Sequence, residues 1–160
     1  MKNIYLPQIV QVTKIIDQSP TVKLFRLEKP KGTFEFNERG LVFVPGQFVL
    51  AGQIGYGEAP FGSSSSPYEN RYIEIVVRKA GGAVTNYLHS LSEGEEITLR
   101  GPFGNGFPLD FIEGKDMVMA TGGCGIPPIA SLIEYIIRNR EKFGRVYLLY
   151  GARSPEEILM

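Results

Sequence analysis

The stretch that decides the fold is Thr121-Gly-Gly-Cys-Gly-Ile-Pro-Pro128, which joins a short apolar run (residues 116–121) to a segment of helical periodicity. Apolar side chains recur with the spacing of one helix face at Ile129, Leu132, Ile133 and Ile136. Basic residues suited to the last turns follow, namely Arg138, Arg140 and Lys142, before Gly144 ends the helix. A second apolar run covers residues 145–150. This order predicts a β-α-β unit with parallel strands and a right-handed crossover.

The glycines of this loop suit a phosphorylated ligand. They let the backbone turn tightly and approach a pyrophosphate closely, beside the free N–H groups of a helix N-terminus. The loop is not a G-x-G-x-x-G fingerprint, because Pro128 replaces the last glycine, and it lacks the Gly-Lys-Ser/Thr ending of a Walker A loop. A plain strand-to-helix turn explains the same residues, so the loop alone leaves both interpretations open.

The chain upstream has a different character. Short β-favouring runs separated by glycine and proline occur at residues 10–12, 22–28, 47–53, 73–78 and 97–100. Several short strands at this spacing predict a closed or nearly closed antiparallel barrel. One short helix interrupts them, with Val84, Tyr87, Leu88 and Leu91 on one face. We place a domain boundary near Glu113-Gly114, so that residues 1–112 form the barrel and residues 113–160 begin an α/β domain.

Two further loops are candidate ligand sites. Gly81-Gly82-Ala83-Val84-Thr85 opens the short helix, and Thr85 is the predicted N-cap, so this segment is a second candidate phosphate cradle. Residues 59–67 place the Phe61 ring beside several hydroxyls, where a planar heterocycle could stack and form hydrogen bonds. A capped hairpin turn and a surface loop are the simpler explanations of these two segments.

Composition narrows the classes of function. The chain has 160 residues, and Lys plus Arg equals Asp plus Glu at 17 each, which argues against general nucleic-acid binding. One cysteine and one histidine exclude an internal disulfide and a Cys-rich or His-rich metal site. Glycines and prolines interrupt the long apolar stretch 117–137, so it is not read as a membrane span. We therefore expect a soluble, cytoplasmic protein.

Two phosphate cradles and one stacking loop, in this order, suit a flavin and a nicotinamide nucleotide. The whole chain resembles the ferredoxin-reductase-like flavin oxidoreductases, and in particular the branch of sulfhydrogenase gamma subunits and dihydroorotate dehydrogenase electron-transfer subunits. Residues 45–48 look like the family's Pro-Gly-Gln-Phe strand entry, and residues 59–66 occupy the place of its Arg-x-Tyr-Ser flavin motif. The other matches are the Gly-x-x-Thr motif at 82–85, the Gly-Pro-Phe-Gly-x-Gly-Phe turn at 101–107, the glycine loop at 122–128 and the second-strand ending at 150–154.

The resemblance implies a Greek-key FAD barrel followed by an incomplete Rossmann-like NAD(P) domain. It implies hydride transfer from NAD(P)H to FAD, with electrons passing to an iron–sulfur or hydrogenase-like partner subunit. FAD is expected rather than FMN, because FMN has no pyrophosphate. For the flavin it implies Ala59, Pro60, Phe61, Gly62, Ser63, Ser64, Val76, Val77, Arg78, Gly82, Val84 and Thr85. For the nicotinamide nucleotide it implies Gly122, Gly123, Cys124, Gly125, Ile126, Pro127, Gly151 and Arg153.

The chain departs from the family pattern in two places. Ala59 and Gly62 replace the motif's arginine and serine, and Arg78 is the candidate replacement partner of the FAD pyrophosphate. The second departure is that only two strands of the nucleotide domain precede Met160, although Ser154-Pro155-Glu156-Glu157 has the composition of a helix start. We expect a fragment of a longer reductase, with weak NAD(P)H binding and self-association through the incomplete sheet.

Two other functions stay open. A flavin module that never binds nicotinamide nucleotide would not bleach on addition of NAD(P)H. A barrel that serves only as an interaction subunit would be colourless and could not be reconstituted with FAD. Arg153 could meet a 2′-phosphate, but no acidic ribose partner can be placed, so NADH and NADPH remain undistinguished.

Overall fold

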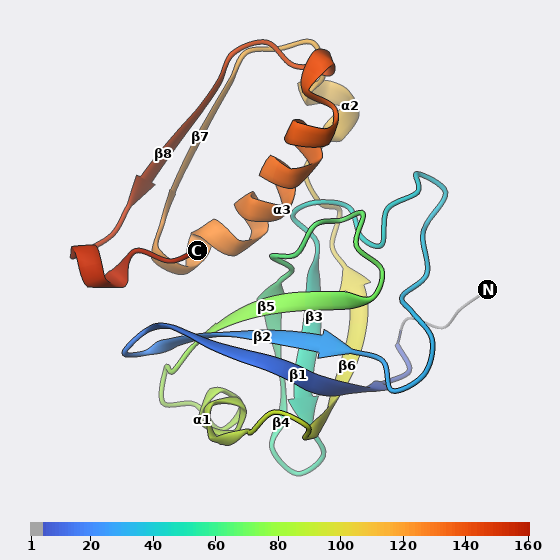
Figure 1. Cartoon of the computed structure of the whole chain (residues 1–160), viewed down its shortest axis with the longest axis vertical. Coiled ribbons are helices and arrows are strands. Elements are labelled where there is room, and N and C mark those ends of the chain that lie inside the picture. Colours follow the sequence, from blue (N-terminus) through green and yellow to red (C-terminus); the bar gives the residue numbers. More distant parts are fainter. Residues whose placement is uncertain (1–4) are drawn as a thin grey trace.

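The computed structural model describes residues 5–160. Two sheets and three helices follow one another along the chain (Figure 1). The strands are β1 (Gln8–Ser19), β2 (Val22–Glu28), β3 (Phe48–Gln53), β4 (Gly57–Gly62), β5 (Tyr72–Arg78), β6 (Glu96–Phe103), β7 (Met117–Gly122) and β8 (Val146–Gly151). The helices are α1 (Ala83–Ser90), α2 (Leu109–Ile112) and α3 (Ile126–Arg138).

The first six strands form one antiparallel sheet, in the order β4-β3-β6-β1-β2-β5. One isolated bridge, between Ser63 and Ile75, joins the two ends of this order. The short strands that the sequence predicts are confirmed, and apolar side chains of this sheet form a buried core. It includes Val10, Val12, Phe25, Leu27, Phe43, Ile75 and Leu88, each at most 1% exposed.

The second sheet pairs β7 with β8 in parallel, as predicted, with Met117 opposite Val146. Helix α3 covers one face of this sheet and buries Leu132 and Ile136 against Met119. The helix begins at Ile126 rather than Pro128, because proline is tolerated in the first turn, where backbone N–H groups have no partner in the helix. It ends at Arg138. Arg140 and Lys142 lie in a separate 3-10 turn, so the prediction that they belong to α3 is wrong.

The two parts share their cores. One cluster packs Leu41 and Leu109 against Met119 and Leu132 of the β7-β8-α3 unit. A second cluster has members from both parts, namely Val22, Leu24, Val76, Ile126 and Leu159. The smaller part is therefore stabilised by apolar side chains of the larger one.

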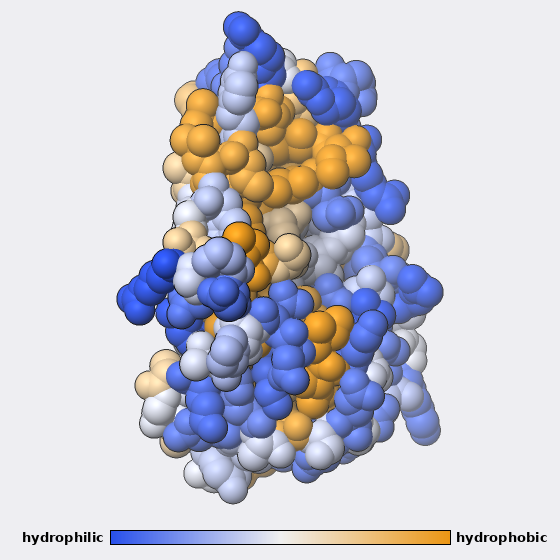
Figure 2. Space-filling model, turned by 60° about the vertical axis from the view of Figure 1, so that its left-hand side comes forward, coloured by the Kyte–Doolittle hydropathy of each residue, from blue (hydrophilic) through white to orange (hydrophobic). Residues whose placement is uncertain are grey.

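The other face of the β7-β8 sheet is exposed. Val118, Tyr147 and Leu149 are 68%, 51% and 61% accessible to solvent. Figure 2 shows the resulting patch of hydrophobic side chains over the upper part of the molecule, where β7 and β8 lie. None of the helices within residues 5–160 is long and apolar enough to cross a membrane.

Candidate functional site

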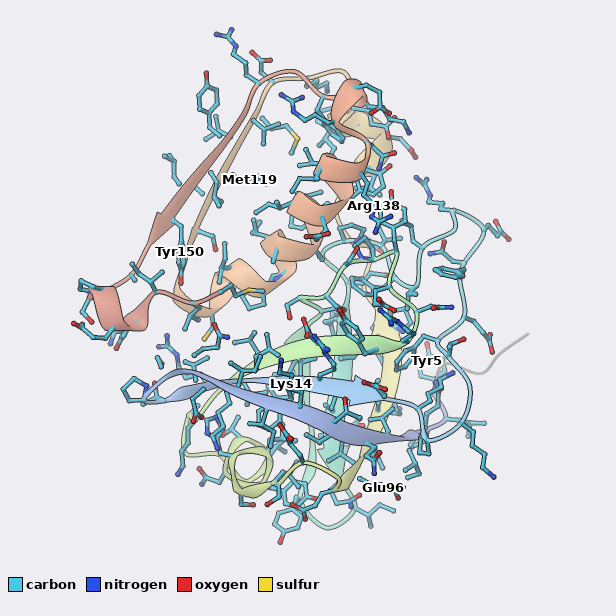
Figure 3. The ribbon with its side chains drawn as sticks, viewed as in Figure 1. Tyr5, Lys14, Glu96, Met119, Arg138 and Tyr150 are labelled. Carbon is cyan, nitrogen blue, oxygen red and sulfur yellow. The ribbon has the colours of Figure 1, made fainter. Side chains whose placement is uncertain are left out.

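The glycine loop is a tight turn between β7 and α3. Residues Gly123–Gly125 form a single 3-10 turn, and Gly123 has φ of +49°, a left-handed conformation that disfavours other residues. A Cβ at position 125 would collide with the Thr121 hydroxyl. Tyr150 of β8 is labelled in Figure 3, and its hydroxyl donates to the Gly123 carbonyl (3.4 Å). The backbone here is therefore held in one shape that needs glycine.

A pocket of 560 Å³ opens beside this loop. It brings together several of the predicted nucleotide residues and adds three that were not predicted to lie there, Arg78, Ala152 and Glu157. Ile126 and Pro127 do not line it, because they are buried in the first turn of α3. The predicted residues in its wall are Gly122, Gly123, Cys124, Gly125, Gly151 and Arg153.

Arg78 lines this pocket. Its Nη2 is 3.2 Å from the position that a Cβ on Gly123 would take, and its Nε is buried without a partner. Seven of the nine arginines, all within residues 5–160, form a side-chain hydrogen bond or lie over an aromatic ring. Arg78 and Arg153 do neither, and both line this pocket.

The serine loop is buried, so the interpretation as a surface loop is wrong. Ser64 donates from its backbone N–H (2.8 Å) and its hydroxyl (3.1 Å) to the Glu74 carbonyl, and the Ser65 hydroxyl accepts from the Glu74 N–H (3.2 Å). The Ser63 and Ser66 hydroxyls are buried without a partner. An unsatisfied buried hydroxyl costs about 1–3 kcal/mol, so these two groups fit the polar edge of a bound ring.

Phe61 and Gly62 end β4 where the two halves meet. Phe61 pairs with Val49 and packs against the core of the six-stranded sheet, so its ring is half-buried. Gly62 lies against Pro128, because a Cβ there would be 3.1 Å from the proline ring. The predicted flavin loop and the predicted nucleotide loop are therefore in direct contact.

The second cradle forms differently from the prediction. The N-cap of α1 is Gly82, without a side-chain cap, so Thr85 is not the cap. Its hydroxyl instead donates to the Gly82 carbonyl (3.1 Å) and accepts from the Ala80 N–H (3.4 Å), because the threonine lies inside the first turn. Gly81 (φ +82°) faces open space. The turn is thus braced from within and leaves room for a ligand.

The remaining predicted residues lie in β4, β5 and the first turn of α1. Val76 and Val77 are buried, in two different apolar clusters. Ala59 and Pro60 pair with Ala51 and Leu50 in the ladder between β4 and β3. Val84 packs against the same hairpin, 3.7 Å from the position of a Cβ on Gly57. These residues shape the backbone around the site.

Comparison with known proteins matches each half of the chain to a domain model. Residues 9–107 match the oxidoreductase FAD-binding domain, and residues 119–160 match the oxidoreductase NAD-binding domain. The sulfhydrogenase 2 gamma subunit of Pyrococcus furiosus is 37% identical over 97% of this chain and 51% of its own length. A probable dihydroorotate dehydrogenase B (NAD(+)) electron transfer subunit of Thermococcus kodakarensis is 35% identical, over 94% and 55%.

Solved structures show the same fold. Phthalate dioxygenase reductase superposes with a TM-score of 0.78 at 21% identity, covering 96% of this chain and 46% of the other. Ferredoxin-NADP+ reductase from Plasmodium falciparum gives 0.77 at 17% identity, covering 99% and 64%. The chain spans about half the length of the curated relatives it matches. The FAD-binding domain match covers more than half of the chain, so the chain belongs to the family of oxidoreductases with this FAD-binding domain, and it has the fold of the ferredoxin-NADP+ reductases.

Proposed function

We propose that the chain works as an NAD(P)H-dependent flavin oxidoreductase module that passes electrons from NAD(P)H through FAD to a partner redox subunit. The observation that carries this proposal is the pocket beside the glycine loop, where Arg78 and Arg153 converge without any other partner. Arg78 is partly buried and its Nε has no partner, which is costly for a charged group, whereas Arg153 is exposed at the same pocket. Two arginines beside glycine backbone suit the phosphates of a nucleotide.

The residues divide into two sites under this proposal. Bound FAD would accept a hydride from NAD(P)H and release electrons one at a time. The Ser63 and Ser66 hydroxyls would bind the edge of its ring, and Phe61 would limit access to one side. The backbone of Gly81 and Gly82 would hold its pyrophosphate. Arg78, unlike its predicted role, would bind the nicotinamide nucleotide.

The contact between Gly62 and Pro128 supports the hydride step. Hydride transfer needs the two rings at near-contact distance, with solvent excluded between them. In this chain the two loops that would hold the rings already touch. No protein acid or base is required in this arrangement, so we assign no catalytic side chain.

We further propose that the six-stranded sheet behaves as a closed Greek-key barrel, residues 1–112. The bridge between Ser63 and Ile75 supports closure between its two ends. Residues 113–160 would be the first part of a larger Rossmann-like domain, which the match of 119–160 to an NAD-binding domain supports. A cytoplasmic location would suit a partner of the sulfhydrogenase or iron–sulfur kind.

Binding titrations test the nucleotide site directly. Arg78→Ala should weaken NADH or NADPH binding by about 1.5–3 kcal/mol, the range for hydrogen bonds to charged groups, and leave FAD affinity unchanged. Lys79→Ala is the matched control, because it removes the same charge one residue further along the chain, outside the pocket. If Arg78→Ala instead weakened FAD binding, Arg78 would be assigned to the FAD pyrophosphate, as the sequence predicts.

Anaerobic reduction then separates the candidate functions. Addition of NADH or NADPH to the FAD-loaded protein should bleach the flavin absorbance. FAD binding without bleaching at saturating nucleotide would favour an electron-transfer module that does not use nicotinamide. A colourless protein that cannot be reconstituted with FAD would favour an interaction subunit.

For the 160-residue chain by itself, without the rest of such a domain, we also propose that a second copy covers the exposed face of the β7-β8 sheet. Within residues 5–160, each of the two strands has one edge without a neighbouring strand, and the exposed side chains on this sheet include Val118, Tyr147 and Leu149. A two-fold axis would place the apolar patch on itself and bury it from both sides. Unpaired strands with an apolar face are otherwise prone to uncontrolled association.

A further inference from the structure

We propose that the six-stranded sheet holds a second ligand site, for a neutral, flat, bicyclic molecule with a hydroxyl or carbonyl oxygen. A pocket of about 330 Å³ opens at the end of the sheet where β3 and β5 begin, under the loop between β2 and β3. None of the residues predicted to bind FAD or the nicotinamide nucleotide lines this pocket. The site is therefore separate from the proposed redox site, and the inference does not rest on that function.

The floor of this pocket is part of the main core. Val49 of β3, Ile73 of β5 and Leu99 of β6 reach it from three strands, and each is at most 3% exposed. Protein interiors are packed as densely as organic crystals, so a hollow of this size that reaches the core is uncommon. The mouth of a curled sheet is also a preferred place for ligand pockets. A ligand here would supply apolar contacts that the side chains around the hollow lack.

The loop that covers the pocket is held on both sides. The Phe34 N–H donates to the Asn70 carbonyl (2.7 Å), and the Val42 N–H donates to the Pro67 carbonyl (2.8 Å). Between these two points, the Asn37 side-chain oxygen accepts from two backbone N–H groups of the loop itself (2.9 and 3.2 Å). The pocket is therefore pre-formed, as ligand pockets usually are.

The volume of the pocket sets the size of the ligand. An apolar cavity of about 150 Å³ holds one benzene ring, so this pocket, at about 330 Å³, has room for two fused rings. The rings of Phe34 and Phe36 form part of the wall. Aromatic walls favour flat ligands, because rings pack well in offset or edge-to-face contacts. A bicyclic aromatic ligand fits both the volume and the wall.

The wall selects against a charged ligand. Its charged side chains within residues 5–160 are Glu35 and Arg100, and Arg100 already forms an ion pair with Glu58. These wall residues therefore offer no spare cation to an anionic ligand. A cationic ligand would lose its hydration against the apolar floor, which is costly. A neutral ligand avoids both costs.

Gln8 gives the ligand its polar partner. Gln8 lies directly opposite Leu99 in the ladder between β1 and β6, so the two side chains share the face that lines the pocket. The amide of Gln47 is already occupied at both ends, since it accepts from the Val44 N–H and donates to the Gly104 carbonyl (2.7 Å each). Gln8 is thus the neutral amide that can turn toward a hydroxyl or carbonyl of the ligand.

An empty packing defect is the competing explanation, and a pair of probes distinguishes the two. 2-Naphthol has the expected rings and a hydroxyl, whereas naphthalene has the same rings without oxygen. Each probe is titrated at neutral pH into the isotope-labelled full chain, without flavin, and followed by backbone amide NMR shifts. The shifts give both the Kd and the place of binding. We expect them at Gln8, Phe36 and Gly101, and not at Gly81 and Gly82.

Gln8→Leu separates the polar contact from the apolar ones. It should raise the Kd for 2-naphthol about 2- to 13-fold, the range of a neutral hydrogen bond, and leave the Kd for naphthalene unchanged. Leucine is similar in size and keeps the wall closed. Ile9→Leu is the matched control, because Ile9 is the next residue of β1, is 49% exposed and lies outside the pocket.

Gln8→Phe tests the cavity itself. A phenyl ring would take about half of the volume, so the Kd for both probes should rise at least about tenfold. Ile9→Phe adds the same ring outside the pocket and should change neither Kd. The amide spectrum of each variant without probe shows that it is folded.

Other results would overturn the proposal. An absence of shifts near Gln8, up to the solubility limit of both probes, would make the hollow an unfilled defect. Shifts centred on Gly81 or on the glycine loop would place the probes in the proposed cofactor sites instead. A Kd for 2-naphthol that Gln8→Leu leaves unchanged, or that changes equally for naphthalene, would remove the oxygen from the class of ligand.

Discussion

The six-stranded sheet and the β7-β8-α3 unit bury their apolar side chains in different ways. The sheet curls around its own core, where the largest side chains are almost inaccessible to solvent. The smaller unit covers one face of its two strands with α3 and leaves the other exposed. Its helix also packs against Leu41, Val22 and Leu24 of the sheet part. The first half therefore carries its own stability, and the second depends on it.

The largest expected effect on this dependence comes from removing an aromatic ring from the core of the six-stranded sheet. Phe25→Ala should cost about 3–5 kcal/mol of unfolding free energy, because Phe25 is 1% exposed. Amide exchange of β7 and β8 should rise in parallel with that of β1 and β2. Phe111→Ala is the control, since Phe111 is 67% exposed. Strands β7 and β8 that stay protected while the sheet opens would show the smaller unit to be independent.

The exposed face gives the next largest effect. Leu149→Ser should weaken self-association by about 1.5–3 kcal/mol per buried leucine, while the unfolding free energy of the monomer changes little. Sedimentation velocity over a concentration series measures both species. Ile54→Ser, at the far hairpin, should leave association unchanged. Association that persists unaltered in Leu149→Ser would place the contact elsewhere.

A smaller effect distinguishes the halves at alkaline pH. Burial, followed by a hydrogen bond to Glu113, raises the pKa of Tyr135 from 10.0 to about 12. A raised pKa stabilises the fold below pH 10, and this contribution is lost as the pH rises from 10 to 12. Tyr135→Phe should cost about 1 kcal/mol at pH 7, the value of one hydrogen bond.

The difference in unfolding free energy between the unmodified chain and Tyr135→Phe should shrink above pH 10. Denaturant unfolding at several pH values measures it. Tyr147→Phe is the control, because Tyr147 is on the exposed face. A difference that stays constant to pH 12 would mean that the Tyr135 hydroxyl has no preferred partner.

The smallest effect lies in the sheet half, at acid pH. A hydrogen bond from Arg71 lowers the pKa of Glu69 from 4.5 to about 2. A lowered pKa stabilises the fold above pH 4.5, and the contribution disappears as the pH falls toward 2. Glu69→Gln should thus differ from the unmodified chain at pH 6 and match it at pH 2. Acid unfolding followed by tyrosine fluorescence measures the difference in stability between the two proteins. A difference that widens toward pH 2 would refute the pairing of Glu69 with Arg71.

The sequence predicted the fold well where the signal is local. The β-favouring runs at residues 73–78 and 97–100 are strands β5 and β6, and Ile73 and Ile75 of the first run are buried. The start of α3 was predicted two residues too late. Proline is accepted within the first turn of a helix, so Pro127 and Pro128 do not mark where the helix begins. Thr85 failed as a cap for a similar reason, since a threonine hydroxyl can brace a turn from inside it.

The site was harder to predict where it depends on contacts distant in the chain. Arg78 meets Gly123 across 45 positions, and no local pattern encodes that approach. One signal was present: Val76 is apolar on the face of β5 that also carries Glu74 and Arg78. An apolar residue on an otherwise charged face indicates a covered face, and Val76 indeed packs against Ile126.

The cluster of Val22, Leu24, Val76, Ile126 and Leu159 has a consequence for recombining these proteins. A chimera that joins this sheet half to the nucleotide half of a relative would bring a foreign Ile126 and Leu159 onto a native surface. Mismatched volumes there would create cavities or overpacking at the seam. Joining the two halves between residues 112 and 113 would therefore interrupt no strand, but it would separate side chains that form one core. Exchanging all five side chains together would preserve this cluster, and the contacts of Leu41 and Leu109 with Met119 and Leu132 would have to be matched as well.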